Sequence, residues 1–292
     1  MKRIHSITIS LLILGACNNG DPLSDAYGNF EAVDVMVSAE AQGRILALSA
    51  EEGEHLAKGE TAGIIDTSQL HLRKEQVMAS TVAVNTKINT LDAQAASYRV
   101  QQANLDRELN RVNRLLEDGA ATTRQKEELE GNIALVRSQI VALQTQKATI
   151  QAEKQGLLVQ VKQIDDQIEK ARVINPIDGV VLEKYKEAGE IVAPGQALYK
   201  IADTRELILR AYISGNQLSE VKTGDVVTVR FDGPQGLEQT EGTVSWISSQ
   251  AEFTPKIIQT REERVNLVYA MKVKVANDGR LKIGMPGEIR FR

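Results

Sequence analysis

The residues that could perform chemistry are few and scattered along the chain. There are three histidines and a single cysteine, Cys17, and no two of them have the spacing of a metal site or a Cys-His nucleophile. The neighbouring carboxylates Asp165 and Asp166 fall in a helical pattern, where charged side chains usually face solvent. A glycine-rich loop followed by Lys-Ser or Lys-Thr is missing from the sequence. We therefore predict no catalytic residue, no metal site, no cofactor and no ATP site, and we expect no enzyme activity.

The N-terminal segment, up to Cys17, has the layout of a targeting signal. A basic start precedes an apolar run over residues 7–14, which is too short to span a bilayer and indicates a signal peptide. The run ends in Leu14-Gly15-Ala16-Cys17, which resembles the lipobox of bacterial lipoproteins. That resemblance implies a signal peptide over 1–16 and a diacylated Cys17 as the mature N-terminus. The alternative is an ordinary signal peptide followed by an unpaired thiol.

The charge of the remaining chain argues against one class of partner. Loss of Lys2 and Arg3 with the signal peptide leaves 33 basic against 39 acidic residues. The basic residues are dispersed along helical patterns, so we expect no nucleic-acid binding. Residues 17–30 contain many Asn, Asp, Gly and Ser residues, which predicts a flexible tether between the lipid and the fold. Several acyl chains would hold such a protein stably on a membrane.

Two long heptad patterns occupy the middle of the chain. Apolar residues recur at alternating spacings of four and three over 77–116 and again over 129–171, which keeps one helix face apolar. A sustained period of 3.5 requires a supercoiled partner, and the nearest partner of each helix is the other one. The polar residues that interrupt the patterns are Thr81, Gln102, Lys147 and Lys154.

A short segment, 117–122, separates the two patterns. Gly119 can end the first helix and Thr122 or Thr123 can cap the second, so we predict an antiparallel coiled-coil hairpin over 68–172. Arms of about 47 residues, at about 1.5 Å per residue, would reach roughly 70 Å. The alternative is simple dimerisation through a coiled coil. Matched arm lengths and similar flanking segments favour a hairpin within one chain.

The segments on either side of the hairpin, 31–67 and 173–204, resemble each other. Glycines fall 10 and then 6 residues apart in both. Tight turns between short β-branched runs need positive φ, and glycine supplies it. We therefore predict an internal repeat that builds one split β module. The repeated glycines are Gly43, Gly53 and Gly59 in the first half and Gly179, Gly189 and Gly195 in the second.

The two halves resemble those of the biotinyl/lipoyl domain, which implies a lipoyl-like β-sandwich. Carrier proteins of that family have a modifiable lysine between the halves, whereas here Asp66 is followed by Thr67-Ser68-Gln69 and the helical insert. A carrier role is therefore disfavoured. A split lipoyl domain with an inserted helical hairpin, on a lipoprotein, resembles the HlyD-type membrane fusion proteins, or periplasmic adaptors, over essentially the whole mature chain. The implied fold class is α+β, elongated and multidomain.

The predicted hairpin tip strengthens this resemblance. Arg111, Leu115 and Thr122 match the family's R-x3-L-x6-S/T pattern, with Thr in place of the commoner Ser. In tripartite pumps this pattern engages a TolC-type outer-membrane channel. As a bare pattern it is weak, because such residues are often a helix-seam leucine and a solvated arginine. Its place at the one turn of the hairpin favours the docking interpretation.

From residue 205 to 292 the pattern changes to short strands. Five or six β-branched runs, a turn at 224–225 and a short helix over 216–222 predict a small β-barrel. The resemblance implies the adaptor barrel, and Gly284 to Glu288 resembles its closing turn. Segment 252–269 is similar to adaptors of ABC-type exporters, although a solvated loop explains it equally well. The chain ends without the extra membrane-proximal domain of adaptors that serve large RND pumps, which favours an ABC partner.

The family resemblance implies an energy-passive adaptor in the periplasm of a Gram-negative bacterium, anchored by lipid to the inner membrane. It would link an inner-membrane transporter, ABC-type by preference, to a TolC-type outer-membrane channel. The resemblance also implies a homo-oligomeric ring, commonly of six copies. The alternatives are an adaptor of an RND or MFS pump, a structural coiled-coil lipoprotein scaffold, and a biotin or lipoyl carrier. The sequence identifies no substrate pocket.

Overall fold

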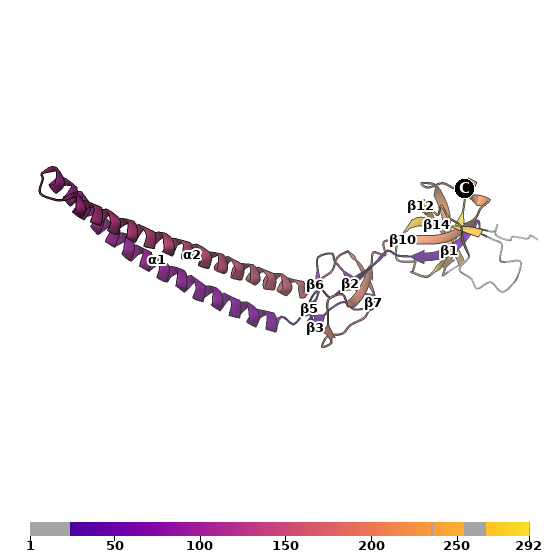
Figure 1. Cartoon of the computed structure of the whole chain (residues 1–292). Coiled ribbons are helices and arrows are strands. Elements are labelled where there is room, and N and C mark those ends of the chain that lie inside the picture. Colours follow the sequence, from indigo (N-terminus) through magenta and orange to yellow (C-terminus); the bar gives the residue numbers. More distant parts are fainter. Residues whose placement is uncertain (1–23, 235, 254–266, 292) are drawn as a thin grey trace, which may run out of the picture. The chain divides into compact units, whose positions relative to one another are not determined.

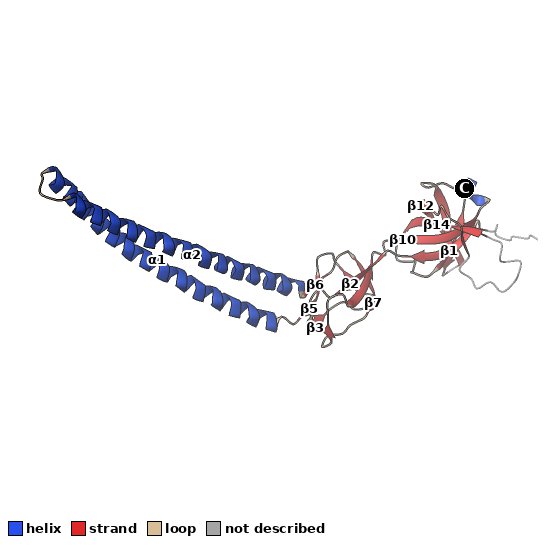
Figure 2. Cartoon of the chain, in the orientation of Figure 1, coloured by secondary structure: helices blue, strands red, loops and turns tan. Residues whose placement is uncertain are grey.

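The computed structural model describes residues 24–234, 236–253 and 267–291 (Figures 1 and 2). They form two compact units, one of residues 34–202 and the other of the described residues before 34 and after 202. The predicted signal peptide, 1–16, and Cys17 lie outside the described residues. Among the helices that are described, none is long and apolar enough to cross a bilayer.

A helical hairpin dominates the first unit. The helices α1 (Ser68–Glu117) and α2 (Thr123–Lys170) have 50 and 48 residues and run antiparallel, side by side (Figure 1). Every residue buried between them belongs to the predicted heptad positions, so the helical hairpin is confirmed. The buried residues are Val84, Ile88, Leu91, Ala95 and Val112 of α1 and Ile133, Val136, Ile140 and Ile164 of α2.

The two lysines that interrupt the second heptad pattern bind polar side chains of α1. Lys147 Nζ donates to the Asp92 carboxylate at 2.6 and 2.8 Å, and Lys154 Nζ donates to Asn85 Oδ1 at 2.8 Å. The partner on α1 moves one heptad back, from Asp92 to Asn85, when the lysine on α2 moves one heptad forward, from Lys147 to Lys154. Both contacts therefore fit the same antiparallel register. These positions are therefore interhelical contacts as well as interruptions of the apolar seam.

The β module from which the hairpin emerges consists of two four-stranded sheets, in the orders β2-β9-β7-β4 and β6-β5-β3-β8. Each sheet contains strands from both sides of the hairpin, which explains why the two halves must fold together. The strands are β2 (Asp34–Ser38), β3 (Gly43–Leu48), β4 (His55–Leu56), β5 (Thr61–Ile65), β6 (Arg172–Ile174), β7 (Gly179–Lys184), β8 (Ile191–Val192) and β9 (Ala197–Ala202).

The backbone hydrogen bonds of the β module show that its halves are repeats. Gly53 N donates to Val181 O at 2.9 Å, and Gly189 N donates to Ile45 O at 2.8 Å. Residues 45 and 53 of the first half are equivalent to residues 181 and 189 of the second half by one constant shift along the chain. The twofold relation between the halves therefore converts each of these two bonds into the other. The bonds from Gly59 N to residue 175 and from Gly195 N to residue 39, both 2.8 Å, exchange in the same way.

Four of the six repeated glycines lie in turns. Gly53, Gly59, Gly189 and Gly195 have φ values between +83° and +95°, a region that favours glycine because it has no Cβ. The expectation of a turn is wrong for the other two. Gly43 and Gly179 begin strands β3 and β7 and have no positive φ. At Gly43 a Cβ would lie 2.7 Å from Ile65 Cγ2, so close packing excludes a larger residue there.

The second unit is a six-stranded β-barrel, as expected for the C-terminal region. Its strands pair in the order β10-β1-β15-β11-β12-β14, and β14 pairs back with β10. A short strand, β13 (Glu252–Phe253), adds to β14, and the predicted short helix is a 3-10 turn at Gln217–Ser219. The barrel strands are β1 (Ala26–Glu31), β10 (Glu206–Ser214), β11 (Val226–Gly233), β12 (Gly236–Ile247), β14 (Leu267–Ala276) and β15 (Pro286–Arg290).

Strand β1 corrects the predicted domain boundaries. Residues 26–30 belong to the barrel, so the predicted tether over 17–30 is wrong there, and the barrel does not consist of 205–292 alone. Phe30 is fully buried in the barrel core, and β1 pairs with both β10 and β15. A Cβ on Gly28 would lie 1.9 Å from Arg210 O, so the glycine that weakens the strand pattern is required by the fold.

Candidate functional site

The hairpin tip is a tight, hydrogen-bonded turn. Ala120 N donates to Leu115 O at 2.7 Å and Gly119 N donates to Leu116 O at 3.1 Å, which closes the last turn of α1. Gly119 has φ +75°, a conformation that other residues adopt only with strain. The reversal therefore depends on one glycine and occupies residues 118–122.

Thr122 begins α2 through a reciprocal cap. Its Oγ1 accepts from Gln125 N at 3.4 Å, while Gln125 Oε1 accepts from Thr122 N at 2.9 Å. These bonds satisfy two backbone donors that the start of a helix otherwise leaves free. The structure thus gives Thr122 a folding role at the tip, in addition to the docking role that the sequence predicts.

The other two predicted tip residues project into solvent. Leu115 is 39% exposed, whereas its neighbour Leu116 lies half-buried in the seam. The Arg111 side chain is 64% exposed and forms an ion pair with Glu108 one turn earlier. An exposed leucine beside an exposed arginine is a surface that the fold of the hairpin does not require. This arrangement can bind another protein through one apolar and one bidentate cationic contact.

The charge on the hairpin surface differs sharply between its middle and its tip. Three of the seven heptad positions lie farthest from the seam and face away from the partner helix. Within 76–104 of α1 and 131–160 of α2, the exposed residues at these three positions include no charged side chain. We call these the neutral outer faces. They comprise Gln76, Ala79, Val82, Ala83, Thr86, Asn89, Thr90, Ala93, Ala96, Ser97, Val100, Ala103 and Asn104 on α1, and Gly131, Ala134, Leu135, Ser138, Val141, Ala142, Thr145, Ala148, Thr149, Ala152, Gln155, Gly156 and Val159 on α2.

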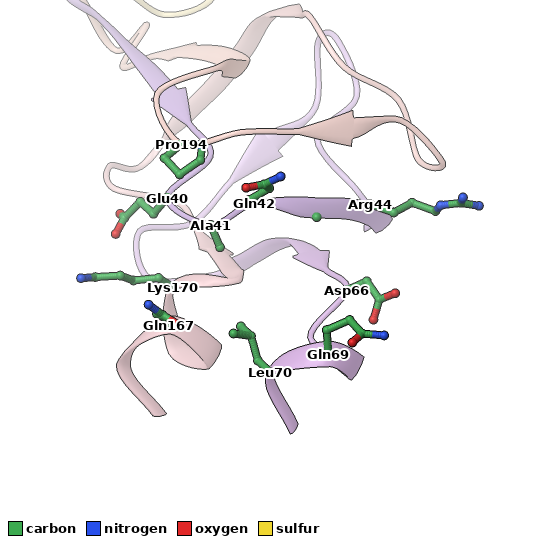
Figure 3. Close-up of a pocket in the computed structure, with 11 residues that line it drawn as sticks. Glu40, Ala41, Gln42, Arg44, Asp66, Gln69, Leu70, Gln167, Lys170 and Pro194 are labelled. Atoms are coloured by element: carbon green, nitrogen blue, oxygen red, sulfur yellow. The ribbon is translucent and has the colours of Figure 1, made fainter. Parts of the chain in front are cut away.

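A cavity of about 510 Å³ lies where the hairpin joins the β module, although the sequence identified no pocket (Figure 3). Leu70 and Gln69 of α1, Gln167 and Lys170 of α2, and the loop before β3 contribute to its wall. Figure 3 shows Lys170 and Arg44 on opposite sides of this space. No local sequence pattern marks the cavity, because its residues come from segments that lie on opposite sides of the hairpin in the sequence.

The charged groups around the cavity are held by neighbouring residues. Hydrogen bonding to Asp166 at 2.7 Å raises the pKa of Lys170. The pKa of Asp66 is lowered, first by the hydrogen bond from the Ser68 hydroxyl at 2.6 Å and then by that from Ser68 N at 2.9 Å. Arg44 adds a favourable charge to Asp66. The cavity wall therefore carries charges of both signs and does not single out anions or cations.

Two further sequence-based expectations fall largely outside the described residues. Cys17, the predicted lipidation site, is one of them. The segment 252–269, which is similar to adaptors of ABC-type exporters, is described only at its ends, in β13 and at the start of β14. Among the described residues, no group of three or more His, Cys, Asp or Glu side chains could hold a metal ion.

Relatives of the chain are known at the level of sequence. No protein-family model matches it. A UPF0194 membrane protein of Acidithiobacillus ferridurans is 25% identical over 343 aligned positions, which cover 98% of this chain and 94% of that protein. The similarity therefore extends through the β module, the hairpin and the barrel.

Solved structures share the fold. MacA from Actinobacillus actinomycetemcomitans has a TM-score of 0.56 at 16% identity, and the match covers 91% of this chain and 78% of that one. The periplasmic adaptor protein EmrA has a TM-score of 0.51, also at 16% identity, and covers 92% and 98%. The chain thus has the fold of a periplasmic adaptor, with a helical hairpin inserted in a β module and a separate β-barrel.

Proposed function

We propose that this chain is the periplasmic adaptor, or membrane fusion, subunit of a tripartite exporter. It would connect an inner-membrane transporter to a TolC-type outer-membrane channel. The observation that carries this proposal is the hairpin, whose 50- and 48-residue helices end in one exposed turn. Such a structure has almost no interior for a small molecule, but it holds a docking surface roughly 70 Å from the β module.

The tip is the proposed contact with the channel. Leu115 would fill an apolar depression on the channel, and Arg111 would pair with a carboxylate or with carbonyl oxygens beside it. The Thr122 cap would hold the turn in one conformation, so that little freedom is lost on binding. These roles follow the family pattern, and the exposure of Arg111 and Leu115 supports them.

The neutral outer faces support assembly of several copies. Small and uncharged residues let two helices approach closely and avoid the cost of desolvating charges. Both helices of the hairpin carry such a face, so each copy can contact a neighbour on either side. We propose a ring of hairpins, with six copies as the family resemblance implies, that encloses a path for the exported molecule.

The β module is proposed to be a lipoyl-like domain that has become a structural collar. Its halves exchange hydrogen bonds as repeats do. Where a carrier domain has its modifiable lysine, Asp66 instead accepts hydrogen bonds from Ser68 and starts α1. A carrier role has no attachment point in this segment.

The proposal includes a membrane anchor at Cys17 and an ABC-type transporter as the inner-membrane partner. The anchor is supported by the lipobox-like sequence that precedes the cysteine. The transporter class is supported by the similarity of segment 252–269. Lipidation is tested by the mass of the mature chain, which should carry acyl groups at its N-terminal cysteine.

The proposed function is tested by a double substitution at the tip, Arg111→Ala with Leu115→Ala. In a strain that depends on this chain for resistance to an exported compound, the double variant should fail to restore resistance at wild-type protein level. The matched control is Arg114→Ala, which removes an exposed arginine outside the pattern and should restore resistance. Full complementation by the double variant would show that the tip does not dock, as expected of a scaffold lipoprotein.

A further inference from the structure

The two sheets of the β module are related by the internal repeat, but their outward surfaces differ. The sheet β6-β5-β3-β8 exposes four large aliphatic side chains, which we call the apolar face. A fold that only had to bury its own core would not need them on the surface. The residues and their exposed fractions are Leu46 57%, Ile64 45%, Ile174 44% and Ile191 68%.

The repeat supplies an internal control for this face. By the constant shift that relates the two halves, Ile64 corresponds to Lys200 and Ile191 corresponds to His55, both on the other sheet. Lys200 lies 3.5 Å from Glu183 and 3.8 Å from Asp34, and its ammonium group lies over the Tyr185 ring. We call the outward surface of the sheet β2-β9-β7-β4 the charged face. The same backbone arrangement is therefore stable with an ion-paired lysine where its repeat has the exposed Ile64, and with a histidine where its repeat has the exposed Ile191.

The two faces also carry charge of opposite sign. Arg44 pairs with exposed Ile191 in the register of β3 and β8, and Arg172 pairs with Ile64 in that of β5 and β6. Arg172 donates to Thr61 Oγ1 at 3.0 Å, and Arg44 lies near the carboxylate of Asp66.

On the charged face, acidic groups outnumber the basic ones. Lys200 lies between the carboxylates of Asp34 and Glu183, at 3.8 and 3.5 Å, so two acidic groups surround one ammonium group there. The charged face also exposes one large apolar side chain, Met36, which pairs with Lys200 across β2 and β9. Cationic and acidic surfaces of this kind attract each other, and each rejects its own copy.

We propose that the apolar face binds the charged face of a second copy of this chain. Arg44 and Arg172 would meet the acidic side chains of the partner, and the aliphatic residues would cover Met36 and the stems of the lysines. The contact is head-to-tail, because each copy contributes a different surface, and repetition closes a ring when the rotation allows it. This inference rests on the proposed function, which requires several copies, and it adds which surfaces of the β module meet.

Head-to-tail contact is favoured over pairing of two apolar faces. A symmetric pair would bring the arginines of both copies to one interface, where Asp66 of each copy would compensate only part of their charge. Like charges at an interface oppose association. Contact between the apolar face and the charged face instead matches unlike charges and leaves a further binding surface on each copy.

Cysteine cross-linking tests which faces meet. In the full chain, Ile64→Cys and Lys200→Cys together should give a ladder of covalent multimers with a short bismaleimide reagent. Each single variant should give no more cross-linking than wild type, whose only cysteine is Cys17. Efficient dimers from Ile64→Cys alone would overturn the inference in favour of symmetric pairing. No ladder in a preparation that is oligomeric by native mass spectrometry would also overturn it.

A second variant tests the energetic role of the apolar face. Ile64→Lys places on this face the residue that its repeat position already carries, so the chain should fold. Assembly should weaken by roughly tenfold or more in dissociation constant. The matched control, Ile283→Lys, adds the same charge at an exposed barrel position and should leave assembly unchanged. Equal assembly of Ile64→Lys and wild type would contradict the inference.

The outcomes separate this inference from the proposed function. If wild type assembles and the Arg111→Ala, Leu115→Ala variant loses function, a missing ladder rejects only the arrangement of the faces. If wild type stays monomeric at all concentrations and the tip variant is active, the adaptor proposal fails as well.

Discussion

The middle and the tip of the hairpin share one internal seam but have opposite exteriors. Between residues 106 and 130, twelve of 25 residues are charged. In the middle, 76–104 contains three charged residues and 131–160 contains four, and none of these seven lies on the neutral outer faces. Exposure to solvent favours charged side chains on the outer faces of a coiled coil, so it does not explain why the middle of the hairpin has uncharged outer faces. The difference indicates two kinds of partner, a copy of the same rod along the middle and a different protein at the tip.

The largest expected effect comes from placing charge on the neutral outer faces. Val82→Asp with Val141→Asp, one change on each helix, should weaken assembly of the chain by about a hundredfold, because each interface would bury an unpaired carboxylate. Both residues are exposed, so the stability of the separate chain should change by no more than about 0.5 kcal/mol. Sedimentation velocity measures the first effect and thermal unfolding of a dilute sample measures the second.

The control for that experiment is the same chemical change at the tip. Asn110→Asp adds a carboxylate to an exposed position in a region already rich in charge. Assembly should be unaffected. If Asn110→Asp weakened assembly as much as the middle substitutions, the distinction between the two regions would be lost.

A smaller effect is expected from removal of the cap at the tip. Thr122→Ala removes the side-chain acceptor for Gln125 N and should cost about 1 kcal/mol of helix stability. The loss should stay local, with faster amide hydrogen exchange over 123–127 and unchanged exchange near Ile140. Thr123→Ala, which lacks the cap bond, is the matched control. Faster exchange along the whole of α2 would show that the tip is not an independent unit.

A similar but smaller change is expected for the interhelical ion pair in the middle. Asp92→Ala leaves Lys147 without its carboxylate partner, and because both side chains are partly exposed the cost should be about 0.5 kcal/mol. High salt should reduce the wild-type advantage, since salt screens the pair. Thermal unfolding in low and high salt measures both. A loss several times larger than this would mean that the pair fixes the register of the whole hairpin.

The smallest effect concerns pH and the two helix starts. The pKa of Asp66 at the start of α1 is lowered by its hydrogen bonds to Ser68, whereas Thr122 at the start of α2 does not titrate. A lowered pKa means that Asp66 stabilises the fold above its unfolded pKa, about 4, and that this contribution is lost as pH falls through the folded pKa. Hydrogen exchange at residues 68–72 should therefore rise below about pH 4 more than at 123–127, and Asp66→Asn should remove the difference.

The hairpin and the repeat could be predicted because their signals are local and periodic. Val84, Ile88 and Leu91 follow one another at heptad spacing, and the turn glycines Gly53 and Gly59 recur after a constant shift. Arg111, Leu115 and Thr122 were found from a pattern, and the structure adds that two are exposed and one is a cap. Their contact with a channel remains a proposal.

Features that depend on long-range contacts escaped the sequence analysis. Strand β1 is short, contains Gly28, and pairs with strands that follow the hairpin and the whole β module in the sequence, so its alternation alone was too weak to identify. The apolar face was missed for a different reason. Leu46 and Ile64 have the composition of core residues, and only the fold shows that they point outward.

One measurement tests both the adaptor role and the proposed difference in partners between the tip and the middle of the hairpin. A photo-cross-linking amino acid at position 115 or at position 141, in cells that express the full chain, would capture the neighbours of the tip and of the middle. Position 115 should capture an outer-membrane channel protein, and position 141 should capture a second copy of this chain. Capture of the chain's own copies at both positions, with no second protein at 115, would contradict a docking tip.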